Sequence, residues 1–290
     1  RGGAVTDDRC PAEVFARLSD PTRVGILLAL DRASTAPVQF SALYDDTDCE
    51  DSARFNYHLQ KLRPWFVRKR DGGYALSAAG HRVVRAIRAG TYAETASLDP
   101  TTVGSRCLSC GADRLRVAYD EGRVVLDCPD CERVVLRVSF PASGVRNREP
   151  EALLDAFDRW SRLQVDHASA GVCPTCGGRV ARGVDPDAVE GDDLVALAAY
   201  DCRVCGWSAH STLGAVACRH PDVRACRRRH GDAPADRHYW ETPQYVTDEH
   251  TTVRSRDPWE VAVRFPFDDG DCRAVVDDDL DVAAFEPPAD

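Results

Sequence analysis

The sequence is poor in lysine and in long apolar runs. Only Lys61 and Lys69 occur among the 37 basic residues, so the other 35 are arginine, against 47 acidic residues. No apolar run approaches the ~18 residues that a membrane helix needs. The first ten residues, RGGAVTDDRC, contain no apolar segment of the kind that marks a secretory signal. We therefore expect a cytoplasmic protein with no membrane partner.

Catalytic motifs are missing as well. The 8 histidines are scattered along the chain. There is no H-E-x-x-H zinc-protease motif, no G-x-S-x-G nucleophile elbow and no phosphate-binding loop. Acidic clusters such as DDGD (268–271) and DDDLD (277–281) are typical of a solvated surface. We therefore expect the protein not to be an enzyme.

The N-terminal part has the periodicity of a helical domain with one hairpin. Apolar spacing and helix caps predict helices over 11–19, 20–33, 41–46, 51–65 and 78–92. In the first helix, Val14, Phe15 and Leu18 are expected to share a buried stripe. Two strands, 67–70 and 74–77, are joined by Asp-Gly-Gly, a strong hairpin signal. This order predicts a winged helix-turn-helix domain over residues 11–95, after a disordered tail over 1–10.

Three stretches of this domain resemble winged-helix regulators of the ArsR type, above all those of haloarchaea. They are LSDPTRVGILLAL (18–30), FNYHLQKL (55–62) and RDGGYALSAAGHRVV (70–84). The resemblance implies a dimeric module that binds double-stranded DNA, and we expect Val83, Val84 and Ile87 to contribute to the dimer seam. ArsR metal sensors carry cysteine on the reading helix, whereas residues 51–62 have none. Metal sensing at that helix is therefore not expected.

Positive charge is concentrated in the same domain. Residues 54–88 contain nine basic residues and one acid, although the formal net charge of the chain is -10. Such an island would neutralise DNA phosphates. The residues expected to face DNA are Ser52, Arg54, Asn56, Tyr57, Lys61, Arg68, Lys69 and Arg70. Arg54 and Asn56 are the expected base readers, while the three hairpin residues would grip phosphates. The alternative is an ordinary basic surface that binds protein.

Eight of the 13 cysteines form four C-x2-C pairs. They make two quartets, Cys107, Cys110, Cys128 and Cys131, and Cys173, Cys176, Cys202 and Cys205. Each quartet spans a strand-rich segment, so a hairpin can bring its two pairs together as in a zinc ribbon. A closed shell of four thiolates favours a structural zinc ion, with iron or a thiol redox switch as alternatives. Gly follows three pairs, supplying the positive φ that such turns often need, and Glu132 follows the fourth.

The remaining cysteines are expected to be ordinary thiols, because a disulfide framework is not expected in a cytosolic chain of this size. Cys10, Cys49 and Cys272 have no partner in the pattern. A looser group with ligand-type side chains consists of Cys218, His220, Cys226 and His230. Its segment, CRHPDVRACRRRHGD, looks helical. Packing without a metal is therefore the favoured interpretation, and a third metal site is the alternative.

The predicted fold class is α+β. The winged-helix domain is followed by a first zinc ribbon over 100–145, and then by a helix, a second ribbon and a small C-terminal α+β region over 146–290. The leading functional interpretation is a dimeric, sequence-specific transcriptional regulator, with repression favoured, whose C-terminal domain senses a small molecule or recruits a protein. One alternative is a transcription-associated adaptor whose ribbons bind protein. The other is a redox sensor whose quartets lose metal on oxidation.

Overall fold

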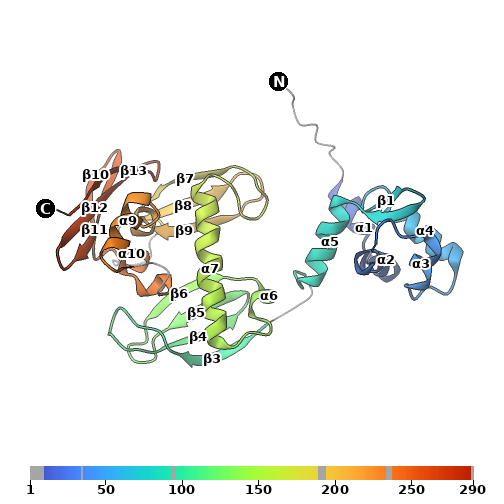
Figure 1. The fold of residues 1–290 in the computed structure, drawn as a ribbon, viewed down its shortest axis with the longest axis horizontal. Helices are drawn as coiled ribbons and strands as arrows, with labels where there is room; N and C mark the ends of the chain where they lie inside the picture. The colour runs from blue at the N-terminus through green and yellow to red at the C-terminus, as the bar shows by residue number, and fades with distance from the viewer. Residues whose placement is uncertain (1–9, 34, 93–95, 189–193, 233–236, 289–290) are drawn as a thin grey trace, which may run out of the picture. The chain divides into compact units, whose positions relative to one another are not determined.

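The computed structural model describes residues 10–33, 35–92, 96–188, 194–232 and 237–288 (Figure 1). The chain forms two compact units, residues 1–94 and residues 95–290. Both units mix helices with small sheets, and every strand pair in the described ranges is antiparallel. Of the expected disordered tail, residues 1–9 lie outside the described residues. No helix in the described part of the chain is long and apolar enough to cross a membrane.

The first unit consists of helices and one hairpin. Its elements are α1 (Pro11–Ala16), α2 (Pro21–Arg32), α3 (Phe40–Asp45), α4 (Ser52–Leu62), β1 (Val67–Arg70), β2 (Gly73–Leu76) and α5 (Ala78–Arg88). Asp20 accepts a hydrogen bond from the backbone N–H of Thr22 at the start of α2, and Asp51 does the same for Ala53 at the start of α4. A carboxylate at each of these positions satisfies a free N–H and complements the helix dipole.

Three helices of the first unit end three or four residues earlier than predicted, and α1 is one of them, since it ends at Ala16. Helix α4 ends at Leu62 because Pro64 disfavours helical backbone at Arg63, which is extended. Helix α5 ends at Arg88 and not at Tyr92. Soon after it, Gly90 adopts a φ of 66°, a left-handed conformation typical of helix C-termini.

The core of the first unit is built from α2, α4 and the hairpin. Phe55 and Leu59 are fully buried, as their helical spacing predicts. Phe15 is 66% exposed, so the expected buried stripe of α1 is wrong at this residue. Helix α1 has only six residues, and none of them is buried. The helix therefore lies at the surface of the core. Val84, expected at a dimer seam, is buried in the core of the unit itself.

The second unit contains three antiparallel sheets, each in sequential strand order. The first consists of β3 (Leu98–Val103), β4 (Leu115–Asp120), β5 (Arg123–Asp127) and β6 (Val134–Ser139). The second consists of β7 (Val180–Asp185), β8 (Leu197–Cys202) and β9 (Ser208–Thr212). The third consists of β10 (Thr251–Arg256), β11 (Trp259–Phe267), β12 (Gly270–Asp277) and β13 (Val282–Glu286). The helical elements are α6 (Ala142–Val145), α7 (Pro150–Ser169), α8 (Leu213–Ala217), α9 (Pro221–Arg229), the 3-10 helix η2 (Tyr239–Glu241) and α10 (Pro243–Val246).

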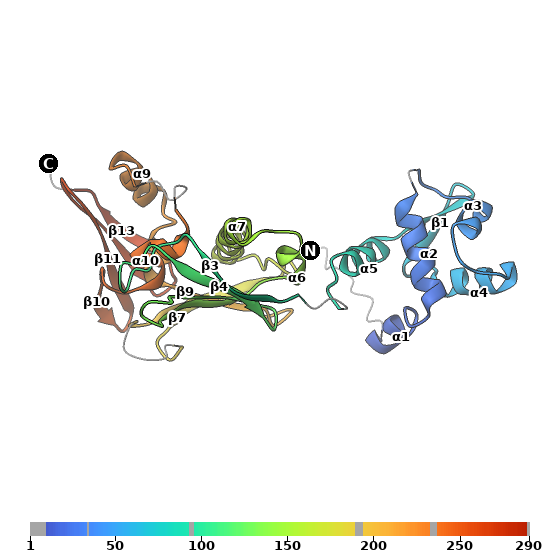
Figure 2. The same cartoon turned by 90° about the horizontal axis from the view of Figure 1, so that it is seen from below.

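Helix α7 connects the first two sheets and packs into both of their cores (Figures 1 and 2). Its N-terminal half contributes Leu153, Leu154 and Phe157 to the core of the first sheet. Near its C-terminus, Ala168 belongs to the core that the second and third sheets share. Because one helix supplies both cores, the two sheets are held in a single unit.

Candidate metal centres and candidate nucleic-acid interface

The structure brings the first cysteine quartet together. The sulfur atoms of Cys107, Cys110, Cys128 and Cys131 all lie within 4.8 Å of one another. The Sγ atoms of Cys107 and Cys131 are 3.8 Å apart, and those of Cys110 and Cys128 are 3.6 Å apart. A tetrahedral zinc ion with Zn–S bonds of ~2.3 Å separates its sulfur ligands by roughly 3.8 Å. The spacing of the four sulfurs therefore fits a tetrahedral metal site.

The second quartet has the same geometry. Cys173, Cys176, Cys202 and Cys205 also place their sulfurs within 4.8 Å of one another. The Cys173–Cys205 distance is 3.7 Å and the Cys176–Cys202 distance is 3.5 Å. In both clusters two cysteines are buried and two are exposed. The donor set of each cluster fits zinc, and four sulfurs leave no open position for a substrate.

All four C-x2-C turns use the same backbone hydrogen bonds. In the turn that begins at Cys202, the Cys202 N–H donates to the carbonyl of Trp207, and the Gly206 N–H donates back to the carbonyl of Cys202. The equivalent bonds begin at Cys107, Cys128 and Cys173. Each turn places the residue after its second cysteine at positive φ, at 77° for Gly111, 59° for Glu132, 73° for Gly177 and 75° for Gly206. Glu132 therefore adopts the conformation that glycine adopts in the other three turns.

Each cluster contains one cysteine whose thiolate is stabilised. Backbone N–H groups of Cys205 and Val204 lower the pKa of Cys202 to about 6. Burial raises the pKa of Cys128, but the backbone N–H groups of Cys131 and Asp130 outweigh it and lower this pKa to about 7. The opposite holds for Cys176: the backbone N–H of Gly178 lowers its pKa, but hydrogen bonds among the sulfurs raise it to about 12. Four sulfurs this close shed their last protons only when a cation replaces them.

The looser cysteine and histidine group is not a metal site in the structure. Cys226 forms a disulfide with Cys272, which joins α9 to β12. The expectation that Cys272 is unpaired is therefore wrong. The 46-residue separation of the two cysteines gives no sequence signal, because pairing depends on how α9 packs on the third sheet. Cys218 instead accepts a hydrogen bond from Arg227 at 3.3 Å. Among the described residues, the two quartets are the only clusters with metal-binding geometry.

Helix α4 presents a polar face to solvent. Ser52, Arg54, Asn56, Tyr57 and Lys61 are all exposed, whereas Phe55, His58, Leu59 and Leu62 are buried. On the neighbouring hairpin, Arg68, Lys69 and Arg70 of β1 are also exposed. The structure thus places every residue that the sequence assigns to DNA contact on the surface of the first unit.

Several of these basic side chains are free of carboxylate partners. Arg70 pairs with Asp71, and Arg88 of α5 pairs with Asp31. No ion pair involves Arg54, Arg68, Lys69, Arg82 or Arg85 within the part of the chain that the structure describes. Cations left without intramolecular partners remain available for an anionic ligand.

The position of α4 is fixed from both sides. Phe40 and Tyr44 of α3 pack edge-on against Phe55, with ring centroids 5.2 and 5.4 Å apart. At the other end, Arg17 donates a hydrogen bond of 2.7 Å to the carbonyl of Lys61 and stacks on Trp65 at 4.5 Å. Arg17 therefore caps the C-terminus of α4. Sequence analysis missed this role, because the two residues are 44 positions apart and no local pattern links them.

The fold and these sites define a protein with two four-cysteine clusters on antiparallel sheets and a helical unit with an exposed basic surface. The chain matches two family models, Domain of unknown function (DUF7351) over residues 104–282 and Domain of unknown function (DUF7347) over residues 11–87. The first match covers more than half of the chain, so the chain belongs to the DUF7351 family. No curated protein and no solved structure matches it.

Proposed function

We propose that the protein is a dimeric, sequence-specific DNA-binding regulator of transcription. In this proposal residues 11–95 form a winged helix-turn-helix domain, α4 enters the major groove and the β1–β2 hairpin is the wing. Each four-cysteine cluster holds one structural zinc ion. The observation that carries the proposal is the exposed polar face of α4 beside basic side chains that have no ion pair in the described residues.

The exposed residues of α4 suit base recognition. Arginine can bind guanine through two hydrogen bonds, and asparagine can bind adenine in the same way. Arg54 and Asn56 carry these groups on the exposed face of α4, and the side chain of Asn56 is engaged only with Gln60 at 3.3 Å among the described residues. Arg68 and Lys69 on β1 supply cations for the phosphates on either side.

Selection from a random pool of double-stranded DNA tests this proposal. The wild-type protein is expected to enrich a two-fold symmetric motif. The variant Arg54→Ala/Asn56→Ala should bind that motif at least about 30-fold more weakly, because the two bidentate base contacts that it removes contribute ~1–3 kcal/mol each. The matched control is Arg123→Ala, which removes an exposed arginine from β5. Failure of the wild type to enrich any motif, or equal enrichment by the double variant, would contradict the proposal.

A protein partner at the metal clusters is the second candidate. Val204 is 71% exposed and lies inside the turn between Cys202 and Cys205. A partner bound at this cluster would cover the Val204 side chain and remove its apolar surface from water. An adaptor of this kind would co-purify with a partner that Val204→Ser releases, while its selected DNA would show no symmetric motif.

A further inference from the structure

A cavity of about 530 Å³ lies in the second unit between the edges of two sheets. Strands β6 and β9 are the last strands of their sheets, and residues 135–139 and 207–212 line the cavity from the two sides. Residues of α7 between 160 and 166 form a third wall, and α7 crosses both sheets in Figure 1. A cavity of this volume is in the range of small-molecule sites.

Much of the lining is aromatic or aliphatic. Trp160 and Val165 face the cavity from α7, and Trp207, Tyr239 and Tyr245 contribute three more rings. Trp160 is held edge-on against Phe140, with ring centroids 5.3 Å apart. Flat rings around a cavity favour a ligand with an apolar, planar body.

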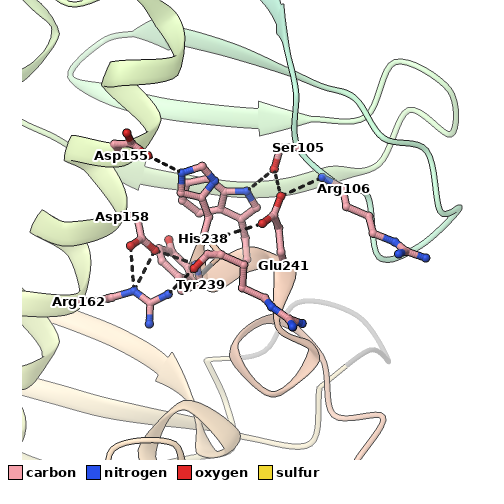
Figure 3. A network of polar contacts seen from close by, with 10 residues as sticks. Ser105, Arg106, Asp155, Asp158, Arg162, His238, Tyr239 and Glu241 are labelled. Atoms are coloured by element: carbon pink, nitrogen blue, oxygen red, sulfur yellow. Dashed lines mark hydrogen bonds and ion pairs between the residues drawn. The ribbon is translucent and has the colours of Figure 1, made fainter. Parts of the chain in front are cut away.

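A hydrogen-bond network fixes one wall of the cavity (Figure 3). Asp158 of α7 accepts the backbone N–H of Tyr239 at 2.7 Å, and both of its oxygens accept the Arg162 Nε–H at 2.9 Å. In the same network, Glu241 accepts a hydrogen bond of 2.6 Å from the hydroxyl group of Ser105. Because Tyr239 and Arg162 are anchored in this way, the wall is preorganised before any ligand binds.

The charge of the cavity is opposite to that of the unit around it. Its lining includes four arginines, Arg137, Arg162, Arg219 and Arg224, and one carboxylate, Asp166. By contrast, residues 96–290 contain 23 basic and 35 acidic residues. Arg219 is fixed by Asp166 at 2.9 Å and by the carbonyl of Ala215 at 3.1 Å, and its side chain is 15% exposed. No ion pair involves Arg137 or Arg224 within the described ranges.

One polar group in the wall lacks a well-formed hydrogen bond within the described residues. Ser161 of α7 is 8% exposed and lines the cavity. Its hydroxyl interacts with the side chain of Tyr239 but makes no hydrogen bond of good geometry to any described residue. A buried hydroxyl group without a well-formed hydrogen bond is unfavourable. Because Ser161 lies beside the cavity, this points to a ligand that forms the hydrogen bond.

We propose that this cavity binds a small organic acid with a planar apolar body. The carboxylate is recognised by Arg224 and Arg219, because a guanidinium group matches a carboxylate through two parallel hydrogen bonds. The apolar body packs between the tryptophans, and Ser161 hydrogen-bonds to a polar atom of the ligand. Binding to the cavity stands by itself, whereas a role for the acid as an effector of DNA binding rests on the proposed function.

The test is calorimetric titration of the whole 290-residue chain in molar KCl. The probes are benzoate, phenylacetate and indole-3-acetate, each compared with its neutral amide. The charged probes are expected to bind with dissociation constants at least tenfold below those of the amides. Arg224→Gln should weaken binding of the acids about tenfold, since a hydrogen bond to a charged group contributes that much. The control Arg123→Ala should bind as the wild type does.

Ser161→Ala separates a binding role from a structural one. If the hydroxyl serves the ligand, this variant loses about three- to tenfold in affinity while its melting temperature stays the same or rises, because it removes a buried group without a well-formed hydrogen bond. A lower melting temperature with unchanged affinity would assign the hydroxyl to the fold and overturn its role in binding.

The site is refuted if no acid in the panel binds, or if the amides bind as well as the acids. It is also refuted if Arg224→Gln keeps the affinity of the wild type. DNA selection with the same protein preparation keeps the two proposals separate. If a DNA motif is enriched but no acid binds, only the cavity proposal is contradicted. If an acid binds but no motif is enriched, only the proposal of a DNA-binding regulator is contradicted.

Discussion

The four cysteine turns allow a test of how much backbone conformation contributes to the second unit. At Gly177, φ is 73°, and an added Cβ would meet nothing within 4 Å. The variant Gly177→Ala therefore introduces no steric clash, and its cost is that of the left-handed backbone. That cost is ~1–2 kcal/mol, and alanine offsets ~0.4–1 kcal/mol of it by restricting the unfolded chain. We expect a net loss of about 1 kcal/mol.

Thermal unfolding with zinc in excess measures this effect. For a unit of this size, a loss of about 1 kcal/mol lowers the midpoint by roughly 2–4 °C. Gly104→Ala is the matched control, because its added Cβ also meets nothing within 4 Å and its φ is outside the left-handed range. This control should be unchanged or more stable by up to ~1 kcal/mol.

The reciprocal variant is Glu132→Gly, at the one turn that lacks glycine. Its φ of 59° is strained for glutamate and relaxed for glycine. We expect the variant to be as stable as the wild type or up to ~1 kcal/mol more stable. If Gly177→Ala and Gly104→Ala shift the midpoint equally, or if Glu132→Gly destabilises the protein, the conformational argument is wrong.

Four further outcomes are expected. Gly25→Ala should stabilise the first unit by up to ~1 kcal/mol in denaturant titration, because Gly25 lies inside α2 and an added Cβ meets nothing within 4 Å. Burial raises the pKa of Asp248, so ionisation of this carboxyl group lowers the free energy of unfolding as the pH rises through that pKa. The uncharged variant Asp248→Asn should therefore have a higher melting temperature than the wild type at pH values above the usual carboxyl range. Removal of zinc with a chelator should lower the thermal unfolding midpoint of the second unit and leave that of the first unit unchanged, and added zinc should restore the midpoint. Arg68→Ala should reduce the slope of log affinity for DNA against log salt by about 0.9.

Local patterns in the sequence predict much of the first unit. Proline at the start of α2, the helical spacing of Phe55 and Leu59 and the Asp-Gly-Gly turn depend on neighbours within a few residues, so the elements appear where expected. Phe15 shows the limit of this reasoning. Periodicity places it on an apolar stripe, but burial requires a neighbour that covers it, and no described residue buries Phe15.

The cysteine quartets were also predictable, because C-x2-C spacing is a local requirement of the turn. In contrast, the cavity has no such signal. Trp160, Trp207 and Tyr239 come from three elements, and only the packing of α7 on two sheets brings them to one place. The Cys226–Cys272 disulfide is similar, since it depends on how α9 meets the third sheet.

Helix α7 also has a consequence for how this protein can be recombined. Two small metal-binding sheets in tandem suggest modules that could be duplicated, shuffled or grafted one at a time. Here Phe157 completes one core and Ala168 the other, so a cut between the sheets would leave an apolar helix face uncovered on one of the pieces. The transferable piece is therefore the whole pair together with its helix. The DUF7351 match agrees with this, since it runs from residue 104 to 282 through both clusters.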